Sequence, residues 1–165
     1  MRRMIRGSNN AAKGIPFLVL ADLERASCAP EVVNEWLPAG PNPNLILRFA
    51  VREVEAWLLA DREALADFLG VHIAIVPINV EQLDDPKREL VNIARRSSRS
   101  DIRRDIVPRT GSSAVVGRGY NARLQHFVVA AWRPDIARNN ANSLARTLAA
   151  LSIFTPSWAV PAPAP

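Results

Sequence analysis

The chain is poor in the residues that cross-link a fold or bind transition metals. Among its 165 residues there is one cysteine, Cys28, so an internal disulfide is excluded. The two histidines, His72 and His126, add too few ligands for a zinc site. No spacing joins these three residues to a third group as a nucleophile triad would require. We expect all three to be packing or surface residues.

Long hydrophobic runs are also lacking. No stretch approaches the ~20 consecutive apolar residues of a transmembrane helix, so we expect no membrane span. The first ten residues are basic and contain no apolar segment, so they do not read as a secretory signal. The cytoplasm is therefore the expected compartment.

Lysine is scarce, and charge is unevenly distributed. Of 21 basic residues only Lys13 and Lys87 are lysine. Residues 1–83 carry 8 basic and 10 acidic side chains, a net charge of −2, whereas residues 84–165 carry 13 basic and 6 acidic ones, a net charge of +7. The planar guanidinium group suits phosphate recognition, although GC-rich coding also produces an excess of arginine. A basic half of this kind is compatible with a nucleic-acid partner.

The pattern predicts one α/β domain over residues 1–154, with an acidic, sheet-containing half (1–83) and a basic, largely helical half (84–154). The apolar fraction of 48% and the length allow a real core. Residues 155–165 alternate alanine and proline towards the end and are expected to form a flexible, extended tail.

Two short apolar runs, 15–22 and 45–51, are bounded by turn signals and predict buried strands. Helices are expected over residues 1–13, 29–37, 53–69, 86–96, 120–132 and 142–151. The 53–69 helix is expected to divide at Asp61, whose side chain would cap the second piece. Residues 72–76 are ambiguous and could form a third strand that Pro77 cuts short. Residues 97–119 are expected to be mostly loop, with one helical turn around 101–105.

Acidic side chains follow both predicted strands. Asp22 and Glu24 end the first run, and Glu53 and Glu55 follow the second. Because ligands bind beyond the carboxyl ends of parallel strands, these groups could converge on a hard cation such as Mg²⁺. We favour Glu55 over Glu53, which could instead pair with Arg52 or sit in the first helical turn. For Asp22 and Glu24 the alternative is an acidic loop that approaches a helix.

A basic stretch follows in the second half. This stretch contains only three acidic residues and eight basic ones. The basic residues are Lys87, Arg88, Arg95, Arg96, Arg99, Arg103, Arg104 and Arg109. A nucleic-acid backbone, DNA or RNA, would be a natural partner. A solvated helix face with local ion pairs is the alternative.

A glycine-containing loop, Val116-Gly117-Arg118-Gly119-Tyr120, opens a predicted helix. Such a loop can present backbone N–H groups to phosphate. It lacks the lysine and the six-residue frame of a P-loop or dinucleotide fingerprint. A tight turn into the helix explains it equally well.

Several blocks of the chain resemble a bacterial group called domain of unknown function 4276. The first block is Phe17-Leu18-Val19-Leu20-Ala21-Asp22-Leu23-Glu24 with Cys28-Ala29-Pro30, and the most specific is the run from Arg48 to Asp61, centred on Arg52-Glu53-Val54-Glu55-Ala56-Trp57. Asp85-Pro86-Lys87-Arg88-Glu89-Leu90, Val107-Pro108-Arg109 and the glycine loop follow in the same order. The resemblance spans about residues 15–150.

The resemblance implies a small TOPRIM-like parallel sheet flanked by helices, as shared by topoisomerases, primases and certain nucleases. It implies Mg²⁺ held by Asp22 and Glu24, with Glu55 as a third acidic member, and relatives that often sit beside ATPases in phage-defence loci. The chain departs from the pattern in two ways. An Asp-x-Glu pair replaces the commoner Asp-x-Asp pair, and no first strand with its glutamate is found. We therefore expect the sheet to lack a strand and to expose unpaired backbone.

The leading hypothesis is a Mg²⁺-dependent nuclease or phosphodiester-processing protein of a phage-defence module with an AAA-type ATPase. Asp22, Glu24 and Glu55 would be its catalytic and metal-binding residues, with the metal polarising the phosphoryl oxygen and activating water. Its expected nucleic-acid-binding residues are Arg95, Arg96, Arg99, Arg103, Arg104, Arg109 and Arg118. The alternative is a truncated, inactive protein that binds nucleic acid or a partner. A third possibility is an interaction protein with no nucleic-acid role.

Overall fold

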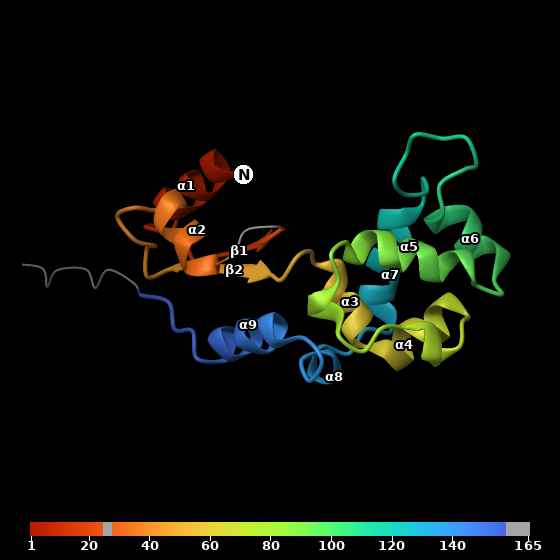
Figure 1. The fold of residues 1–165 in the computed structure, drawn as a ribbon. Coiled ribbons are helices and arrows are strands. Elements are labelled where there is room, and N and C mark those ends of the chain that lie inside the picture. The colour runs from red at the N-terminus through yellow and green to blue at the C-terminus, as the bar shows by residue number, and fades with distance from the viewer. Residues whose placement is uncertain (25–27, 158–165) are drawn as a thin grey trace, which may run out of the picture.

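The structure is a computed structural model that describes residues 1–24 and 28–157. Its elements in chain order are α1 (Arg2–Ala11), β1 (Phe17–Asp22), α2 (Ala29–Trp36), β2 (Leu45–Ala50), α3 (Glu55–Ala60), α4 (Arg62–Leu69), η1 (Ile73–Ile75), η2 (Val80–Gln82), α5 (Pro86–Arg95), α6 (Ser100–Ile106), α7 (Tyr120–Ala130), α8 (Pro134–Ala137) and α9 (Asn142–Ser152). Figure 1 shows the sheet with α1, α2 and α9 on one side of the molecule and α3 to α7 on the other.

The sheet consists of β1 and β2, which pair in parallel with Phe17 opposite Leu45 and Asp22 opposite Ala50. This arrangement confirms the predicted α/β fold with a parallel sheet flanked by helices. Within the described ranges each strand has a single hydrogen-bonded neighbour, so each leaves one edge unpaired, as expected. The two carboxyl ends lie side by side, which is the place where such sheets bind ligands.

Helices cover the two faces of the sheet unequally. On one face Val19 and Leu45 pack with Ile5 of α1 and Leu37 after α2 in a small buried cluster. On the other face α9 contacts β2 (Figure 1). Leu18 of β1 remains 53% exposed, and Leu20 remains 40% exposed. Side chains alternate along a strand, so these two leucines lie on the same face of the sheet as α9. Helix α9 covers the β2 part of that face and leaves the β1 part exposed.

A second and larger buried cluster lies among the helices that follow the sheet. Its largest buried side chains include Leu59 of α3, Leu65 of α4, Leu90 of α5, Ile102 of α6 and Phe127 of α7. This cluster places α3, α5 and α7 around one core, and α3 begins directly after β2. The carboxyl end of the sheet is thereby held against the helical half.

Local capping signals explain where the central helices begin and end. Asp61 divides α3 from α4, as predicted, and its carboxylate accepts a hydrogen bond from the Ala64 N–H at 3.5 Å. Gly70 ends α4 in the left-handed conformation, with φ of 65°. Asp85 caps α5 by accepting from the Arg88 N–H at 2.7 Å, with Pro86 in the first turn.

The ambiguous segment 72–76 does not form a third strand, because its central residues form the short 3₁₀ helix η1. Arg62 explains the difference, since its guanidinium donates to the carbonyl oxygens of Val76 at 3.0 Å and Ile73 at 3.3 Å. These carbonyls therefore have partners without a neighbouring strand. Residues 97–119 also hold more helix than predicted, because α6 has 7 residues in place of one turn. The short elements η2 and α8 were not anticipated.

The segment after α9 returns to the start of β2. The Asn44 side-chain amide donates to the Ser157 carbonyl at 2.9 Å, and the Ser157 N–H donates to Asn44 Oδ1 at 2.7 Å. The first residues of the predicted tail are therefore anchored. The rest of that tail, 158–165, and residues 25–27 lie outside the described residues.

No single helix in the described ranges is long and apolar enough to cross a membrane. Residues Arg62–Leu69 and Ile73–Gln82 reach that length and composition only when taken together, and the chain bends by 112° between them.

Candidate functional site

A polar cluster forms where the two strands end and α3 begins. The Lys87 ammonium group, on α5, lies 3.3 Å from Glu53 Oε1 and 3.5 Å from Glu55 Oε1. Glu53 Oε2 also accepts the Lys87 backbone N–H at 2.9 Å, which satisfies a donor in the first turn of α5. The two carboxylates that follow β2 thus share one ammonium group.

Electrostatics in the cluster favour charged Lys87. Burial alone would lower the pKa of Lys87, but Glu55 and Glu53 raise it above its ordinary value. The positive charge therefore stays fixed among the carboxylates. We call Asp22, Glu53, Glu55 and Lys87 the strand-end cluster.

Asp22 ends β1 and joins this cluster through the backbone. Its Oδ1 accepts the Val54 N–H at 2.9 Å, next to the start of α3. Burial raises the pKa of Asp22, and this effect outweighs the opposing Val54 hydrogen bond and Lys87 charge. Asp22 therefore ties the end of β1 to the segment between β2 and α3.

Glu55 is 5% exposed and faces the helical core. The Tyr120 hydroxyl at the start of α7 donates to Glu55 Oε1 at 2.9 Å. Burial, with the charge of Glu55, raises the pKa of Tyr120, so Tyr120 stays a neutral donor. Glu55 Oε2 is buried and has no partner among the described residues. The choice of Glu55 over Glu53 as the residue that faces Asp22 stays a prediction, and the carboxylates whose charges raise the pKa of Asp22 are Glu53 and Glu24.

Glu24 lies differently from the other predicted ligands. It is exposed, has a positive φ of 52°, and its N–H donates to the Arg52 carbonyl at 2.9 Å. Its charge is the smallest influence on the pKa of Asp22. Glu24 lines a cavity whose walls include neither Asp22 nor Glu55. The three acidic residues therefore do not face one common point.

The positions of Asp22, Glu24 and Glu55 do not fit the expected Mg²⁺ site. Within the described ranges no three His, Cys, Asp or Glu side chains are grouped so that they could hold a metal ion. The position between Glu53 and Glu55 holds the Lys87 ammonium group, which supplies the positive charge itself. Binding of Mg²⁺ by Asp22, Glu24 and Glu55 stays a prediction.

Sequence reasoning did not assign Lys87 and Tyr120 to this site. In the sequence Lys87 belongs to the basic stretch, and Tyr120 begins a predicted helix. One signal was present, because Lys87 is one of only two lysines in a chain that otherwise uses arginine. An ammonium group fits between two carboxylates as a compact charge, whereas guanidinium needs a planar geometry.

Three of the predicted nucleic-acid-binding arginines make internal contacts. Arg99 donates to the Phe68 carbonyl and to Asp101, both at 3.2 Å, and Arg103 donates to the Ser97 carbonyl. Arg104 pairs with Asp105 at 3.0 Å, although its side chain is 74% exposed. These bonds connect α4, the turn after α5, and α6.

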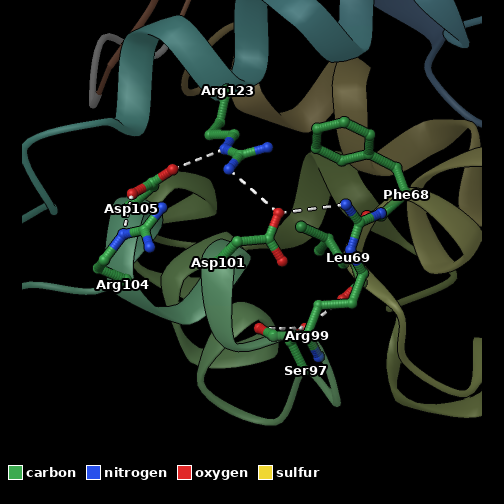
Figure 2. A network of polar contacts seen from close by, with 8 residues as sticks. All are labelled: Phe68, Leu69, Ser97, Arg99, Asp101, Arg104, Asp105 and Arg123. Carbon is green, nitrogen blue, oxygen red and sulfur yellow. Dashed lines mark hydrogen bonds and ion pairs between the residues drawn. The ribbon is translucent and has the colours of Figure 1, made fainter.

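Arg123 of α7 completes this network, which is shown in Figure 2. It lies 3.1 Å from Asp101 Oδ2 and 2.8 Å from Asp105 Oδ2. The hydrogen bond from Arg99 lowers the pKa of Asp101, and those from Arg104 and Arg123 lower the pKa of Asp105. Both aspartates are therefore committed to fixing α6 against its neighbours.

The remaining four predicted arginines are exposed: Arg95, Arg96, Arg109 and Arg118. None of them forms an ion pair with the residues that the structure describes. They lie at the end of α5 and in the loop between α6 and α7, and α6 contacts both of these helices. We call these four residues the open arginines.

The glycine loop before α7 packs against α6 in the way a tight turn does. The N–H of Gly117 donates to the Ile106 carbonyl at 2.8 Å, and that of Gly119 to the Asp105 carbonyl at 2.9 Å. A Cβ on Gly119 would lie 2.7 Å from Asp105 Cβ, and one on Gly117 would clash with the Asp105 backbone. The two glycines permit this close approach. Their N–H groups are used on α6 and are not available to phosphate.

Asp61 has a structural role. It is fully buried, and Arg133 reaches it from the segment before α8 with contacts of 3.0 Å from Nε and 2.6 Å from Nη2. The Arg133 N–H adds a third bond at 2.9 Å. Burial alone would raise the pKa of Asp61, but these bonds lower it. The predicted cap is confirmed.

No protein-family model matches the chain, and neither a curated protein nor a solved structure similar to it was found. The resemblance to domain of unknown function 4276 and to TOPRIM domains stays a prediction.

Proposed function

We propose that the protein binds the phosphate backbone of nucleic acid through the open arginines, without requiring a metal ion. The observation that carries this proposal is the contrast within the basic stretch. Asp101 and Asp105 are engaged by Arg99, Arg104 and Arg123, which leaves the open arginines exposed. Exposed guanidinium groups bind phosphate through charge and planar hydrogen bonding.

The ion-pair network of Asp101 and Asp105 holds in place the segments that carry the open arginines. Arg123 ties α7 to α6, and Arg99 ties the turn after α5 to α4. The segments that carry the open arginines are thus held by charge-assisted hydrogen bonds. A supported surface loses less conformational freedom on binding than a loose one.

Metal-dependent phosphodiester cleavage is the second candidate. One observation favours it: the buried, unpartnered Oε2 of Glu55, which is an unusual state for a carboxylate oxygen. The position of Lys87 argues against it, because the ammonium group already pairs with both Glu53 and Glu55. Association with an ATPase remains a prediction for either candidate.

The test is fluorescence anisotropy with labelled single- and double-stranded DNA and RNA over a salt series. Electrostatic binding falls with salt, and the slope drops by about 1 for each phosphate contact removed. We expect Arg95→Ala combined with Arg96→Ala to weaken binding and reduce this slope by about 2. EDTA should leave the affinity unchanged.

Arg3→Ala combined with Lys13→Ala is the matched control, because both side chains are exposed, in α1 or just after it, and the charge change is the same. This variant should keep the binding of the unmodified chain. A flat titration with every nucleic acid at low salt would overturn the proposal. Mg²⁺-dependent cleavage that disappears in Asp22→Ala would establish the second candidate in its place.

A further inference from the structure

A cavity with a volume of about 880 Å³ opens beside the carboxyl ends of the strands. It lies between α2 and α9, along the free side of β2, and is separate from both the strand-end cluster and the open arginines. Its size is within the range of small-molecule sites, roughly 300–1,000 Å³. Apolar side chains such as Val33 and Phe49 form part of its wall.

Three arginines line this cavity from three different segments. Arg48 comes from β2, Arg52 from the turn after it, and Arg146 from α9. Arg48 Nε is buried without a hydrogen-bond partner among the described residues, and Arg146 forms no ion pair with them. The Arg52 guanidinium group pairs with Asp84 at 3.7 Å, and the Asp84 side chain is 96% exposed. Such a surface pair contributes little.

The cavity is lined by two acidic residues, Glu24 and Glu81, against three arginines. One of the two carboxylates already has hydrogen-bond donors. Glu81 Oε1 accepts hydrogen bonds from both the N–H and the hydroxyl group of Ser143. Glu24 is exposed at the rim, so water screens its charge. Three guanidinium groups against two carboxylates leave the cavity positive. A buried donor without a partner is costly, and an anionic ligand would supply that partner.

The amino end of helix α2 also borders the cavity, and its first turn contains one acidic residue, Glu31. Its first residues, Ala29 and Pro30, line the cavity, and its cap position, Cys28, makes no side-chain hydrogen bond to the helix. The amino end of a helix favours an anion. Glu24 and Arg52, the two non-glycine residues with positive φ in the described ranges, also line the cavity.

We propose that this cavity binds a phosphate monoester, with the phosphate held by Arg48, Arg52 and Arg146 and an apolar body against Val33 and Phe49. A phosphate monoester carries about −1.5 to −2 charges at neutral pH, which the three arginines would neutralise. The ester could belong to a small phosphorylated molecule or to the phosphorylated end of a nucleic-acid strand. The site uses none of the open arginines, so it does not rest on the nucleic-acid proposal.

Cys28 provides a local probe, since it lines the cavity and is the only cysteine of the chain. The experiment follows alkylation of Cys28 by iodoacetamide, read by intact mass, with phenyl phosphate as ligand and phenol as the uncharged control. We expect millimolar phenyl phosphate to slow alkylation several-fold and phenol to have little effect.

Arg146→Ala should raise the phenyl phosphate concentration needed for protection by about tenfold, the loss expected for one charge-assisted hydrogen bond. Arg138→Ala is the matched control, because Arg138 is an exposed arginine outside the cavity. Arg48→Lys keeps the charge but removes the buried Nε and should also weaken protection. Circular dichroism verifies that each variant is folded.

The proposal is overturned if phenyl phosphate leaves the alkylation rate unchanged, if phenol protects equally, or if Arg146→Ala and Arg48→Lys both protect as the unmodified chain does. Two trinucleotides, one 5′-phosphorylated and one with a 5′-hydroxyl, identify the source. Protection by the phosphorylated form alone supports the site and assigns it to a strand end. Protection by phenyl phosphate but by neither trinucleotide supports the site and assigns it to a small phosphorylated molecule.

Discussion

The Nζ atom of Lys87 lies 3.5 Å from Oε1 of Glu55, a carboxylate whose residue is 5% exposed. This contact joins α5 to the start of α3 beside the ends of the strands. Because an isolated buried carboxylate is costly, the Lys87 ammonium group stabilises Glu55 in its buried position. The pair therefore links α3 to α5 next to the ends of the strands.

Lys87→Ala should lower the free energy of unfolding by about 2 kcal/mol, because it leaves Glu53 and Glu55 without their cation. Urea unfolding measures this change. Arg88→Ala is the control, since Arg88 is exposed on the same helix and should change stability little. If the ammonium group replaces a metal ion, Mn²⁺ should raise the thermal midpoint of Lys87→Ala and not that of the unmodified chain. If Lys87→Ala and Arg88→Ala were equally stable, the proposed role of Lys87 would be contradicted.

Asp22→Asn tests the raised pKa of Asp22. A carboxyl group with a raised folded pKa binds its proton more tightly in the folded state, so its stabilising contribution is present below its ordinary pKa of 3.8. That contribution is lost as pH rises through the folded pKa. Asparagine keeps an oxygen that can accept from the Val54 N–H, so the variant should be as stable as the unmodified chain at pH 7, or more stable. Thermal unfolding from pH 3 to pH 7 measures the difference, and a variant less stable at pH 7 but not at pH 3 would refute it.

Asp61→Ala should cost about 3 kcal/mol of stability, because Asp61 is fully buried and accepts bonds from Arg133 and from the start of α4. Its folded pKa is lowered, so this stabilisation is present above the ordinary pKa of 3.8 and disappears as pH falls through the folded pKa. Urea unfolding across an acidic pH series should show that loss in the unmodified chain and not in Asp61→Ala. Glu63→Ala is the control, because Glu63 also contacts Arg133 but its side chain is 72% exposed.

Gly117→Ala should destabilise the chain by roughly 1–3 kcal/mol, because the new Cβ would press on the Asp105 backbone. Gly7→Ala is the contrasting variant. Gly7 lies inside α1 with no atom within 4 Å of the added Cβ, so alanine there should stabilise by about 0.5–1 kcal/mol. Thermal unfolding of both variants decides between a packing role for the glycine loop and a free loop. A neutral Gly117→Ala would favour the free loop.

The elements that sequence reasoning predicted well depend on neighbours along the chain. The strand ending at Asp22 and the break at Asp61 follow from short apolar runs and capping residues. The left-handed Gly70 and the Asp85–Pro86 helix start are signals of the same local kind. Each can be read from a few adjacent residues, because the hydrogen bonds concerned are closed within one helical turn.

The composition of the candidate site was harder to predict because its contacts join distant segments. The hydrogen bond from Tyr120 to Glu55 spans 65 positions, and Lys87 reaches Glu53 across 34. A charge count of the basic stretch could not show that Asp101 and Asp105 serve several arginines at once. The same limit applies to η1, where Arg62 bonds to carbonyls that a strand would have directed to a neighbour.

The reciprocal hydrogen bonds between Asn44 and Ser157 have a practical consequence for handling the protein. Asn44 precedes β2, whereas the phosphate cavity opens beside the carboxyl ends of the strands. Ser157 is therefore held at the end of the sheet opposite the cavity. A probe attached at Ser157 should leave the cavity open to a ligand in solution, which makes this position a suitable attachment point for binding assays.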